Sequence, residues 1–173
     1  MDKIPNNIPS DVFNVILCRR SVRSYKKDPL PSGVIDKMLE AASWAPSGLN
    51  NQPWRFMVIT QDSQKESLAR FTKYGSVIKS APVIIVVCMD IGESYNREKD
   101  LMSIGACIQN MMLQAYSMGI GTCWLGEIVN KKEKVAASLK LDSDLEVVAV
   151  VAAGYPQEKG FKGCRKPLTE LKL

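Results

Sequence analysis

The segment RRSVRSY at residues 19–25 gathers three arginines and two serines within seven positions. Guanidinium groups bind phosphate oxygens through paired hydrogen bonds, and a phosphate monoester carries about two negative charges at neutral pH. Arg19 and Arg23, with the hydroxyl of Ser21 between them, could therefore form a phosphate cradle. A run of like charge is also typical of a solvated surface, so the rest of the chain has to decide between the two interpretations.

Two further segments carry groups suited to a flat polar ligand. In ASWAPSGLNNQPWRF at 42–56, a turn at residues 46–48 precedes three amide side chains at residues 50–52. Amides both donate and accept hydrogen bonds, as the edge of a heterocycle requires. In GIGTCWLGE at 119–127, glycines allow the backbone to approach such a ligand closely. Taken alone, the first segment would be an ordinary loop between a helix and a strand.

Several kinds of chemistry are excluded or disfavoured. The chain has no histidine, which removes Ser-His-Asp and Cys-His catalysis and any histidine-ligated zinc. Its five cysteines are scattered, so we expect buried or inert thiols and no metal site. No P-loop and no Rossmann glycine pattern occurs, and Glu40, Glu93 and Glu127 are isolated carboxylates. The net charge of +5 suits an anionic small ligand as well as nucleic acid, although few aromatics accompany the basic groups.

Apolar periodicity predicts the elements that hold these segments. A first helix is expected to begin at the N-cap Ser10 and to end near residues 19 and 20, where the helix dipole favours cations. Four of its apolar residues share one face, namely Val12, Phe13, Ile16 and Leu17. A second helix is expected over 34–42 and a strand over 54–60. Ser63 and Glu66 form a capping box for a helix that continues to Tyr74.

The second half is expected to contain a strand at 82–89 that is buried on both faces, and a long helix from Asp100 to Gly119. The inward side of that helix carries Leu101, Ile104, Ile108, Met111, Met112 and Ala115. A short strand or turn at 122–126, a helix capped by Asn130 and a buried strand at 145–154 follow. This order indicates a layered sheet with helices against it, in one domain over residues 1–173. The tail at 155–173 is too polar to pack alone, so we expect it to lie along a partner subunit.

Taken together, four motifs resemble the nitroreductase-like family of FMN-dependent NAD(P)H oxidoreductases: RRSVRSY at 19–25, APSGLNNQPWRF at 45–56, IGACIQNMMLQAYSMGIGTCWLG at 104–126, and GYP with a later RKPL at 154–168. Their order spans nearly the whole chain, which is short for the family. The resemblance implies an α+β fold with a mostly antiparallel central sheet flanked by helices. It also implies a homodimer that exchanges the C-terminal segments and holds FMN in two interfacial clefts.

Carried onto this chain, the resemblance implies a set of cofactor-binding residues. Arg19, Arg20, Ser21 and Arg23 would hold the phosphate, ribityl chain and pyrimidine edge of the flavin. Pro46, Ser47, Gly48 and Asn50 would come from the other subunit and cover the ring, with Gln52 close by. Leu125 and Gly126 would place backbone amides near flavin N5, and Arg165 and Lys166 would close on the phosphate. Lys73 is an additional candidate from a segment that departs from the family pattern.

The resulting expectation is a cytoplasmic FMN enzyme that takes a hydride from NADH or NADPH. It would pass the hydride to nitroaromatic, quinone or similar acceptors by a ping-pong mechanism, and its partners would be a second copy of the chain and small molecules. A flavin-binding or flavin-processing protein of the same fold is the first alternative. A cofactor-free basic binding module is the second. No apolar run is long enough to span a bilayer, so we expect no membrane association.

Overall fold

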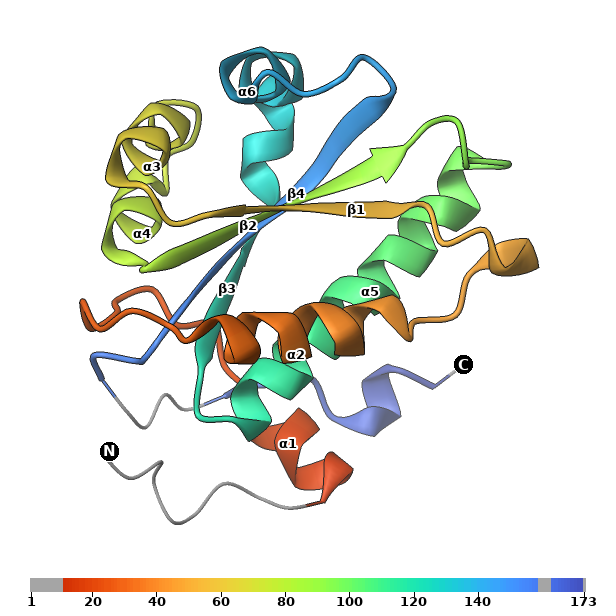
Figure 1. The fold of residues 1–173 in the computed structure, drawn as a ribbon. Helices are drawn as coiled ribbons and strands as arrows, with labels where there is room; N and C mark the ends of the chain where they lie inside the picture. The colour runs from red at the N-terminus through yellow and green to blue at the C-terminus, as the bar shows by residue number, and fades with distance from the viewer. Residues whose placement is uncertain (1–10, 159–162, 173) are drawn as a thin grey trace.

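The computed structural model describes residues 11–158 and 163–172, and the expected N-cap Ser10 lies outside them. At its centre is a four-stranded sheet in the order β1-β2-β4-β3 (Figure 1). The strands are β1 (Trp54–Ile59), β2 (Val83–Asp90), β3 (Gly121–Leu125) and β4 (Leu145–Gly154). All three pairings are antiparallel, which confirms the predicted α+β sheet.

Helices cover both faces of this sheet (Figure 1). One face packs on α2 (Ser32–Ser43) and α5 (Arg97–Ser117), and the other on α3 (Asp62–Ala69), α4 (Gly75–Ser80) and α6 (Lys132–Leu139). Successive side chains of a strand point to opposite faces, so Ile85 and Val87 enter the first core while Ile84 and Val86 enter the second. The buried character predicted for β2 is therefore confirmed. The predicted inward side of α5 is confirmed as well, except for Leu101, which is only half-buried.

The first helix differs from its prediction. The helix α1 (Val12–Cys18) is capped by Asp11, whose side chain accepts a hydrogen bond from the backbone N–H of Asn14 at 2.9 Å. Only Val15 is buried, whereas the four apolar residues of the predicted shared face are exposed, with Phe13 at 68%. Periodicity identified a shared face correctly but could not say what packs on it.

The boundaries of three other helices also differ. The helix predicted through Tyr74 ends at Ala69, and a separate helix, α4, begins at Gly75, where a Cβ would lie 2.6 Å from the carbonyl oxygen of Ala69. The α3 N-cap is Gln61, so the predicted capping box is wrong. A 3-10 segment, η2 (Gly126–Lys131), occupies the expected Asn130 cap, and α5 begins three residues earlier than predicted.

The segment that follows α1 lies along the edge strand β3. Ser21 forms a parallel bridge with Thr122, and the N–H of Val22 donates to the Thr122 carbonyl at 2.9 Å. The buried hydroxyl of Tyr25 donates to the Val22 carbonyl at 2.6 Å, which fixes the turn of the chain. An exposed strand edge is a site for unwanted pairing, and this segment covers it.

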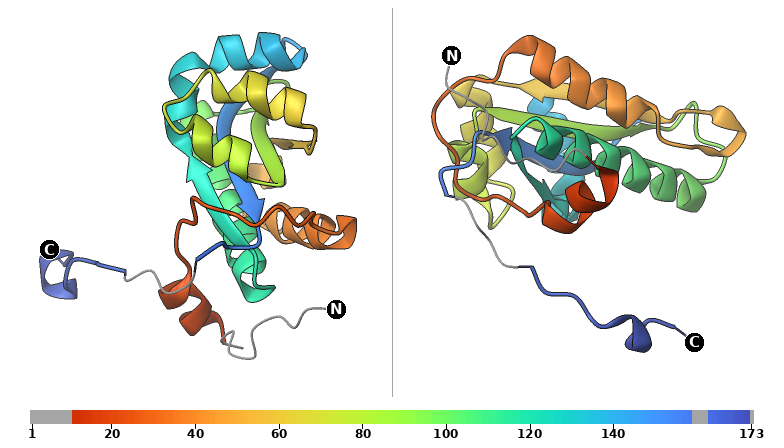
Figure 2. Two further views of the ribbon diagram at one scale, coloured as in Figure 1. Left: turned by 90° about the vertical axis from the view of Figure 1, so that its left-hand side faces the viewer. Right: turned by 90° about the horizontal axis from the view of Figure 1, so that it is seen from below.

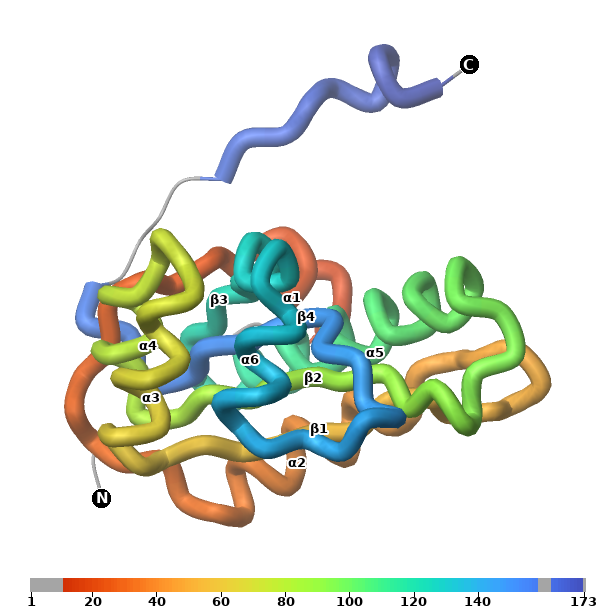
Figure 3. Tube along the Cα trace, turned by 90° about the horizontal axis from the view of Figure 1, so that it is seen from above, coloured from red at the N-terminus to blue at the C-terminus, as the bar shows by residue number. Residues whose placement is uncertain are grey.

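The tail leaves the body of the molecule. Residues 163–172 extend away from the sheet and its helices and end in the 3-10 turn η3 (Leu168–Glu170), as Figures 2 and 3 show. Every one of these residues is exposed, including Leu168 and Leu171. The described part of the tail thus makes no core of its own, in agreement with its composition.

The cysteines fall into two groups. Cys88, Cys107 and Cys123 are buried, and burial raises the pKa of each thiol, to about 11 for Cys88 and about 12 for Cys107. The other two, Cys18 and Cys164, are exposed, so of the two expectations, buried or inert thiols, burial does not apply to them. None of the five forms a disulfide. Within the described residues, no helix has both the length and the apolar character needed to cross a membrane.

An ion-pair network joins α5 and α6 to β4. The guanidinium of Arg97 donates to both carboxylate oxygens of Glu146, and Lys132 pairs with the same carboxylate. The hydrogen bonds from Arg97 are the main cause that lowers the pKa of Glu146 to about 2. Glu146 is only 14% exposed in its side chain, whereas Arg97 is 56% exposed, so water weakens part of this network.

We expect Glu146→Gln to lower the free energy of unfolding by about 2 kcal/mol at pH 7, allowing for solvent screening. The folded-state pKa lies below the unfolded value, so the contribution is present above about pH 4.5 and disappears as the pH falls toward 2. Urea denaturation at pH 7 and pH 2.5 measures this dependence. Glu40→Gln, at an exposed residue, serves as the control and should have little effect. An equal loss for Glu146→Gln at both pH values would contradict the expectation.

Candidate functional site

Four arginines form a basic cluster near the C-terminal end of α1, namely Arg19, Arg20, Arg23 and Arg165. Arg19 is the C-cap of α1, and its backbone N–H donates to the Val15 carbonyl at 3.0 Å. The Nε atoms of Arg19 and Arg20 are buried and have no hydrogen-bond partner among the described atoms. Burial, followed by repulsion from Arg165 and Arg20, lowers the pKa of the Arg19 guanidinium.

The basic cluster lacks a counter-charge within the part of the chain that the structure describes. The ion pairs found there involve other cations: Arg55, Lys65, Arg97, Lys132 and Lys166. Arg20 donates instead to the carbonyl oxygens of Leu17 at 2.6 Å and Arg19 at 2.8 Å. Half-buried cations without an anion are costly, so this arrangement is suited to bind one from outside.

The bridge between Ser21 and Thr122 joins the basic cluster to the N-terminal part of β3. From there, β3 runs away from the cluster to Leu125, and Gly126 follows directly after the strand. Gly126 is four residues beyond Thr122, which corresponds to about 13 Å of extended chain. Leu125 is buried while Gly126 is exposed, so the backbone at the end of this path is accessible. The structure thus places two of the predicted groups along one edge of the sheet.

Glu127 ties a further segment to this edge. Its carboxylate accepts hydrogen bonds from the Thr72 hydroxyl and from the backbone N–H of Lys73. The bond from Thr72 is the main cause that lowers the pKa of Glu127. Glu127 is therefore held by neighbouring donors, and the candidate Lys73 lies next to the start of η2. Nothing in the spacing of residues 72 and 127 could have indicated this contact.

The loop 46–52 contains the 3-10 turn η1 (Gly48–Asn50) and an unusual backbone. Three non-glycine residues have positive φ angles: Leu49 at 56°, Asn50 at 55° and Gln52 at 46°. Each such residue costs roughly 1–3 kcal/mol and persists only where its surroundings impose it. The Ser47 hydroxyl oxygen accepts a hydrogen bond from the Gln52 N–H at 3.0 Å, and the Gln52 side chain donates to the Asn50 carbonyl at 3.3 Å.

This loop lies far from the basic cluster of the same chain. Arg20 is close enough for its positive charge to act on Tyr116, near the C-terminal end of α5, whereas Asn51 donates a hydrogen bond to Asp100 in the first turn of that helix. Sixteen residues of helix separate residues 100 and 116, which corresponds to about 24 Å. Figures 1 and 2 show the loop and α1 toward opposite ends of α5. The structure therefore does not bring Pro46, Ser47, Gly48, Asn50 and Gln52 to the arginines within one subunit.

The two tail candidates are differently placed. Arg165 is close enough to Arg19 to lower the pKa of that guanidinium, and a Cβ at Gly163 would overlap the Arg20 side chain. Lys166 is exposed and lies 4.0 Å from the Glu170 carboxylate. The start of the described tail thus belongs to the basic cluster, while Lys166 contacts only the tail itself.

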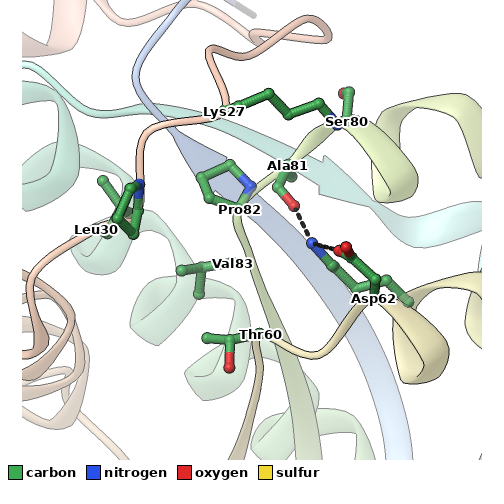
Figure 4. A pocket seen from close by; sticks show the side chains of 10 residues that line it. Lys27, Leu30, Thr60, Asp62, Ser80, Ala81, Pro82 and Val83 are labelled. Atoms are coloured by element: carbon green, nitrogen blue, oxygen red, sulfur yellow. Dashed lines mark hydrogen bonds and ion pairs between the residues drawn. The ribbon is translucent and has the colours of Figure 1, made fainter.

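A cavity of about 390 Å³ lies elsewhere, between the segment after the basic cluster and the N-terminal ends of α3 and β2 (Figure 4). Its floor includes the buried Lys65, whose Nζ donates to the Ala81 carbonyl at 3.0 Å and pairs with Asp62 at 2.8 Å. None of the predicted site residues lines this cavity. Because its buried cation is already satisfied by groups of the protein, the cavity adds nothing to the anion-binding arrangement described above.

The sequence and the fold of this chain match those of known proteins. The model of the nitroreductase family matches residues 16–75 and 61–155. An NADH dehydrogenase from Thermus thermophilus is 30% identical, over 94% of this chain and 95% of its own. A protein from Methanothermobacter thermautotrophicus, provisionally named NADH dehydrogenase/NAD(P)H nitroreductase, is 31% identical over 86% of this chain and 78% of its own.

A solved structure from Desulfovibrio desulfuricans agrees with these matches. It is provisionally named a nitroreductase, was solved in complex with FMN, and is 42% identical, with a TM-score of 0.91 over 95% of this chain and 96% of that one. The fold is thus that of nitroreductases. This chain belongs to the nitroreductase family and is an oxidoreductase.

Because the cations of the basic cluster have no anionic partner among the described residues, we predict that phosphate stabilises the ligand-free protein. We expect about 10 mM phosphate to raise the thermal unfolding midpoint of ligand-free protein by about 2–4 °C, as binding in the millimolar range would do. Arg19→Ala should remove most of this rise, whereas Arg70→Ala, at an exposed arginine of α3's end, should keep it. Differential scanning fluorimetry at constant ionic strength makes the measurement. The same rise with sodium chloride, or in Arg19→Ala, would contradict specific binding.

Proposed function

We propose that this protein is an FMN-dependent oxidoreductase that passes a hydride from NADH or NADPH to nitroaromatic, quinone or similar acceptors. The observation that carries the proposal is the basic cluster, whose half-buried arginines lack an anion among the described residues. The FMN complex of the Desulfovibrio relative supports FMN as the missing group. FMN would supply the redox chemistry, which a chain without histidine cannot readily supply itself.

The residues near the basic cluster fit the phosphate end of this cofactor. Arg19, Arg20 and Arg165 would share the phosphate, with Ser21 and Lys166 beside them. The unpartnered Nε atoms of Arg19 and Arg20 provide donors for it. Arg23 is bound only weakly within the chain, through a 3.4 Å contact with the Ser21 carbonyl, so it is free to turn toward the flavin. A fixed cation there would stabilise the negative charge that reduction adds to the ring.

The end of β3 fits the ring. From Thr122 to Gly126 the extended chain covers about 13 Å, which suits an extended mononucleotide held by its phosphate at one end. The backbone amides of Leu125 and Gly126 would lie near the reactive nitrogen N5 and orient it. Reductant and acceptor would then occupy the open face of the ring in turn, as in a ping-pong mechanism.

The loop 46–52 would complete the site from a second subunit. The separation of about 24 Å along α5 prevents these residues from covering a ligand on their own basic cluster. Apolar side chains left exposed by the single chain support an interface; they include Val12, Phe13, Trp44, Leu49, Met102, Leu168 and Leu171. In the proposed homodimer, residues 1–173 form one flavin-binding domain, and the tail at 155–173 wraps the partner. Pro46, Ser47, Gly48, Asn50 and Gln52 then face the partner's flavin.

An absorbance spectrum tests the proposed function directly. We expect purified protein, reconstituted with FMN if necessary, to show the visible bands of a flavin and to lose them on anaerobic addition of NADH or NADPH. Reoxidation by a quinone would complete one turnover. Bands that persist with both nucleotides would favour a flavin-binding or flavin-processing protein. Absence of bands after reconstitution would favour the cofactor-free module and reject the proposal.

Mixed dimers test the proposed sharing of the site. Arg19→Ala combined with Arg23→Ala should weaken FMN binding at least about tenfold, because charge-assisted phosphate contacts are lost. Ser47→Trp should obstruct the partner's cleft and leave the basic cluster intact. A heterodimer of the two variants would contain one fully intact site and one doubly defective site.

We therefore expect tagged heterodimers to regain about half of the wild-type FMN occupancy and activity, while each homodimer stays defective. Heterodimers without any regained activity would show that the loop and the basic cluster act within one subunit. Mixed dimers of wild-type chains carrying the same two tags provide the control for purification.

A further inference from the structure

Asp100 has an unusual environment for a carboxylate. It is completely buried in the first turn of α5, and no cation pairs with it among the described residues. Four hydrogen-bond donors surround it instead. Oδ2 accepts from the Ser94 hydroxyl at 2.7 Å and from two backbone N–H groups, those of Tyr95 and Asn96, at 3.2 Å each. Oδ1 accepts from the Asn51 side chain at 2.8 Å.

These bonds connect two loops that are far apart in the sequence. The Nδ2 group of Asn51 donates both to Asp100 and to the Glu93 carbonyl, at 2.9 Å. The loop 91–96 is thereby tied to the loop 46–52. Tyr95 lies so close to Gly48 that a Cβ at residue 48 would overlap its hydroxyl. Asp100 is therefore at the centre of the contacts that hold both loops against the start of α5.

Of the two loops, the loop 46–52 is the one with a strained backbone. Asn51 lies between Asn50 and Gln52, which both have positive φ angles, and Leu49 has a third. Such a conformation is kept only when surrounding bonds impose it, and strain of this kind concentrates at functional sites. The Ser47–Gln52 hydrogen bond acts within the loop, whereas Asn51 provides the bonds from the loop to Asp100 and Glu93.

We infer that Asp100 is a positioning residue for the flavin site of the partner subunit. It fixes Asn51, and through it the residues on either side, in the orientation that the partner's ring requires. The inference rests on the proposed function, since it assumes that this loop covers the flavin across the interface. It goes further by naming the residue that sets the loop's conformation and by assigning that residue to the site of the other subunit.

The chemistry at this position requires a carboxylate. All four neighbours donate, so both oxygens must accept. Burial alone would raise the pKa of Asp100, but the hydrogen bonds from Ser94, Asn51 and the two backbone amides outweigh it and lower the pKa, so the group is ionised at neutral pH. An asparagine would place an NH₂ group against either the Asn51 amide or the Ser94 cluster. Asp100→Asn thus breaks the link with almost no change in volume.

The experiment compares Asp100→Asn with Ile59→Val, both as full-length protein with FMN. Ile59 is buried at the opposite end of β1 from the loop, so its shortening lowers the unfolding midpoint without touching the loop 46–52. We expect Asp100→Asn to raise the FMN dissociation constant about tenfold and to lower kcat/KM, with faster amide exchange confined to residues 46–52 and 91–96. Ile59→Val should leave the dissociation constant within about twofold of wild type.

A charge-swapped pair gives a rescue. Asn51→Asp alone opposes two carboxylates and should be defective, while Asn51→Asp with Asp100→Asn restores a donor facing an acceptor. We expect the double variant to recover part of the FMN affinity, so that the two effects are not additive. The recovery is partial because a carboxylate at position 51 cannot donate to the Glu93 carbonyl.

The outcomes separate this inference from the proposed function. If wild type binds FMN and Asp100→Asn binds it as tightly as Ile59→Val does, Asp100 is merely structural and the inference is overturned, while the proposed function stands. If wild type binds no FMN at all, the proposed function fails and the inference fails with it. Weaker FMN binding with exchange spread evenly over the sheet would also overturn it, because the defect would then be global.

Discussion

The burial of β2 between two apolar layers is the constraint on which the rest of the structure depends. Seven of its eight residues are buried, so helices must cover both faces of the sheet. With β2 and β4 in the centre, β1 and β3 become the edges. Each edge then carries one half of the proposed flavin site, because the arginine segment lies along β3 and the strained loop leads into β1.

At the basic cluster, folding imposes an electrostatic cost that the binding of an anion would remove. Folding brings Arg19, Arg20 and Arg165 together against repulsion and buries part of two guanidinium groups. The apolar layers supply the stability that offsets this cost. An anion that enters the cluster removes both the repulsion and the unsatisfied donors, so the site gains affinity because the empty fold is unfavourable there.

The sequence predicted the sheet and most elements, because continuous apolar runs and helical periodicity directly reflect burial. It was less informative about surfaces that a single chain leaves open. The apolar face of α1, with Phe13 and Leu17, satisfies helical spacing but is left largely exposed by the residues that the structure describes. Caps such as Ser63 were wrong because the helix start depends on the preceding loop. Asp100 was missed although its spacing from Ile104 places it on the buried face of α5; a charge at such a position needs donors from elsewhere in the chain.

The length of α5 supports the proposal that the site needs two copies of the chain. A helix of 21 residues spans about 30 Å, longer than any small cofactor, with the basic cluster near one end and the Asp100 contacts at the other. One subunit therefore carries the two proposed half-sites too far apart to meet. In a two-fold dimer with antiparallel α5 helices, each end of one helix would lie beside the opposite end of its partner, so both pairs of half-sites would close at once. In the proposed homodimer, dimerisation and completion of the site would then be one event, and burial of the exposed apolar face of α1 would contribute to both.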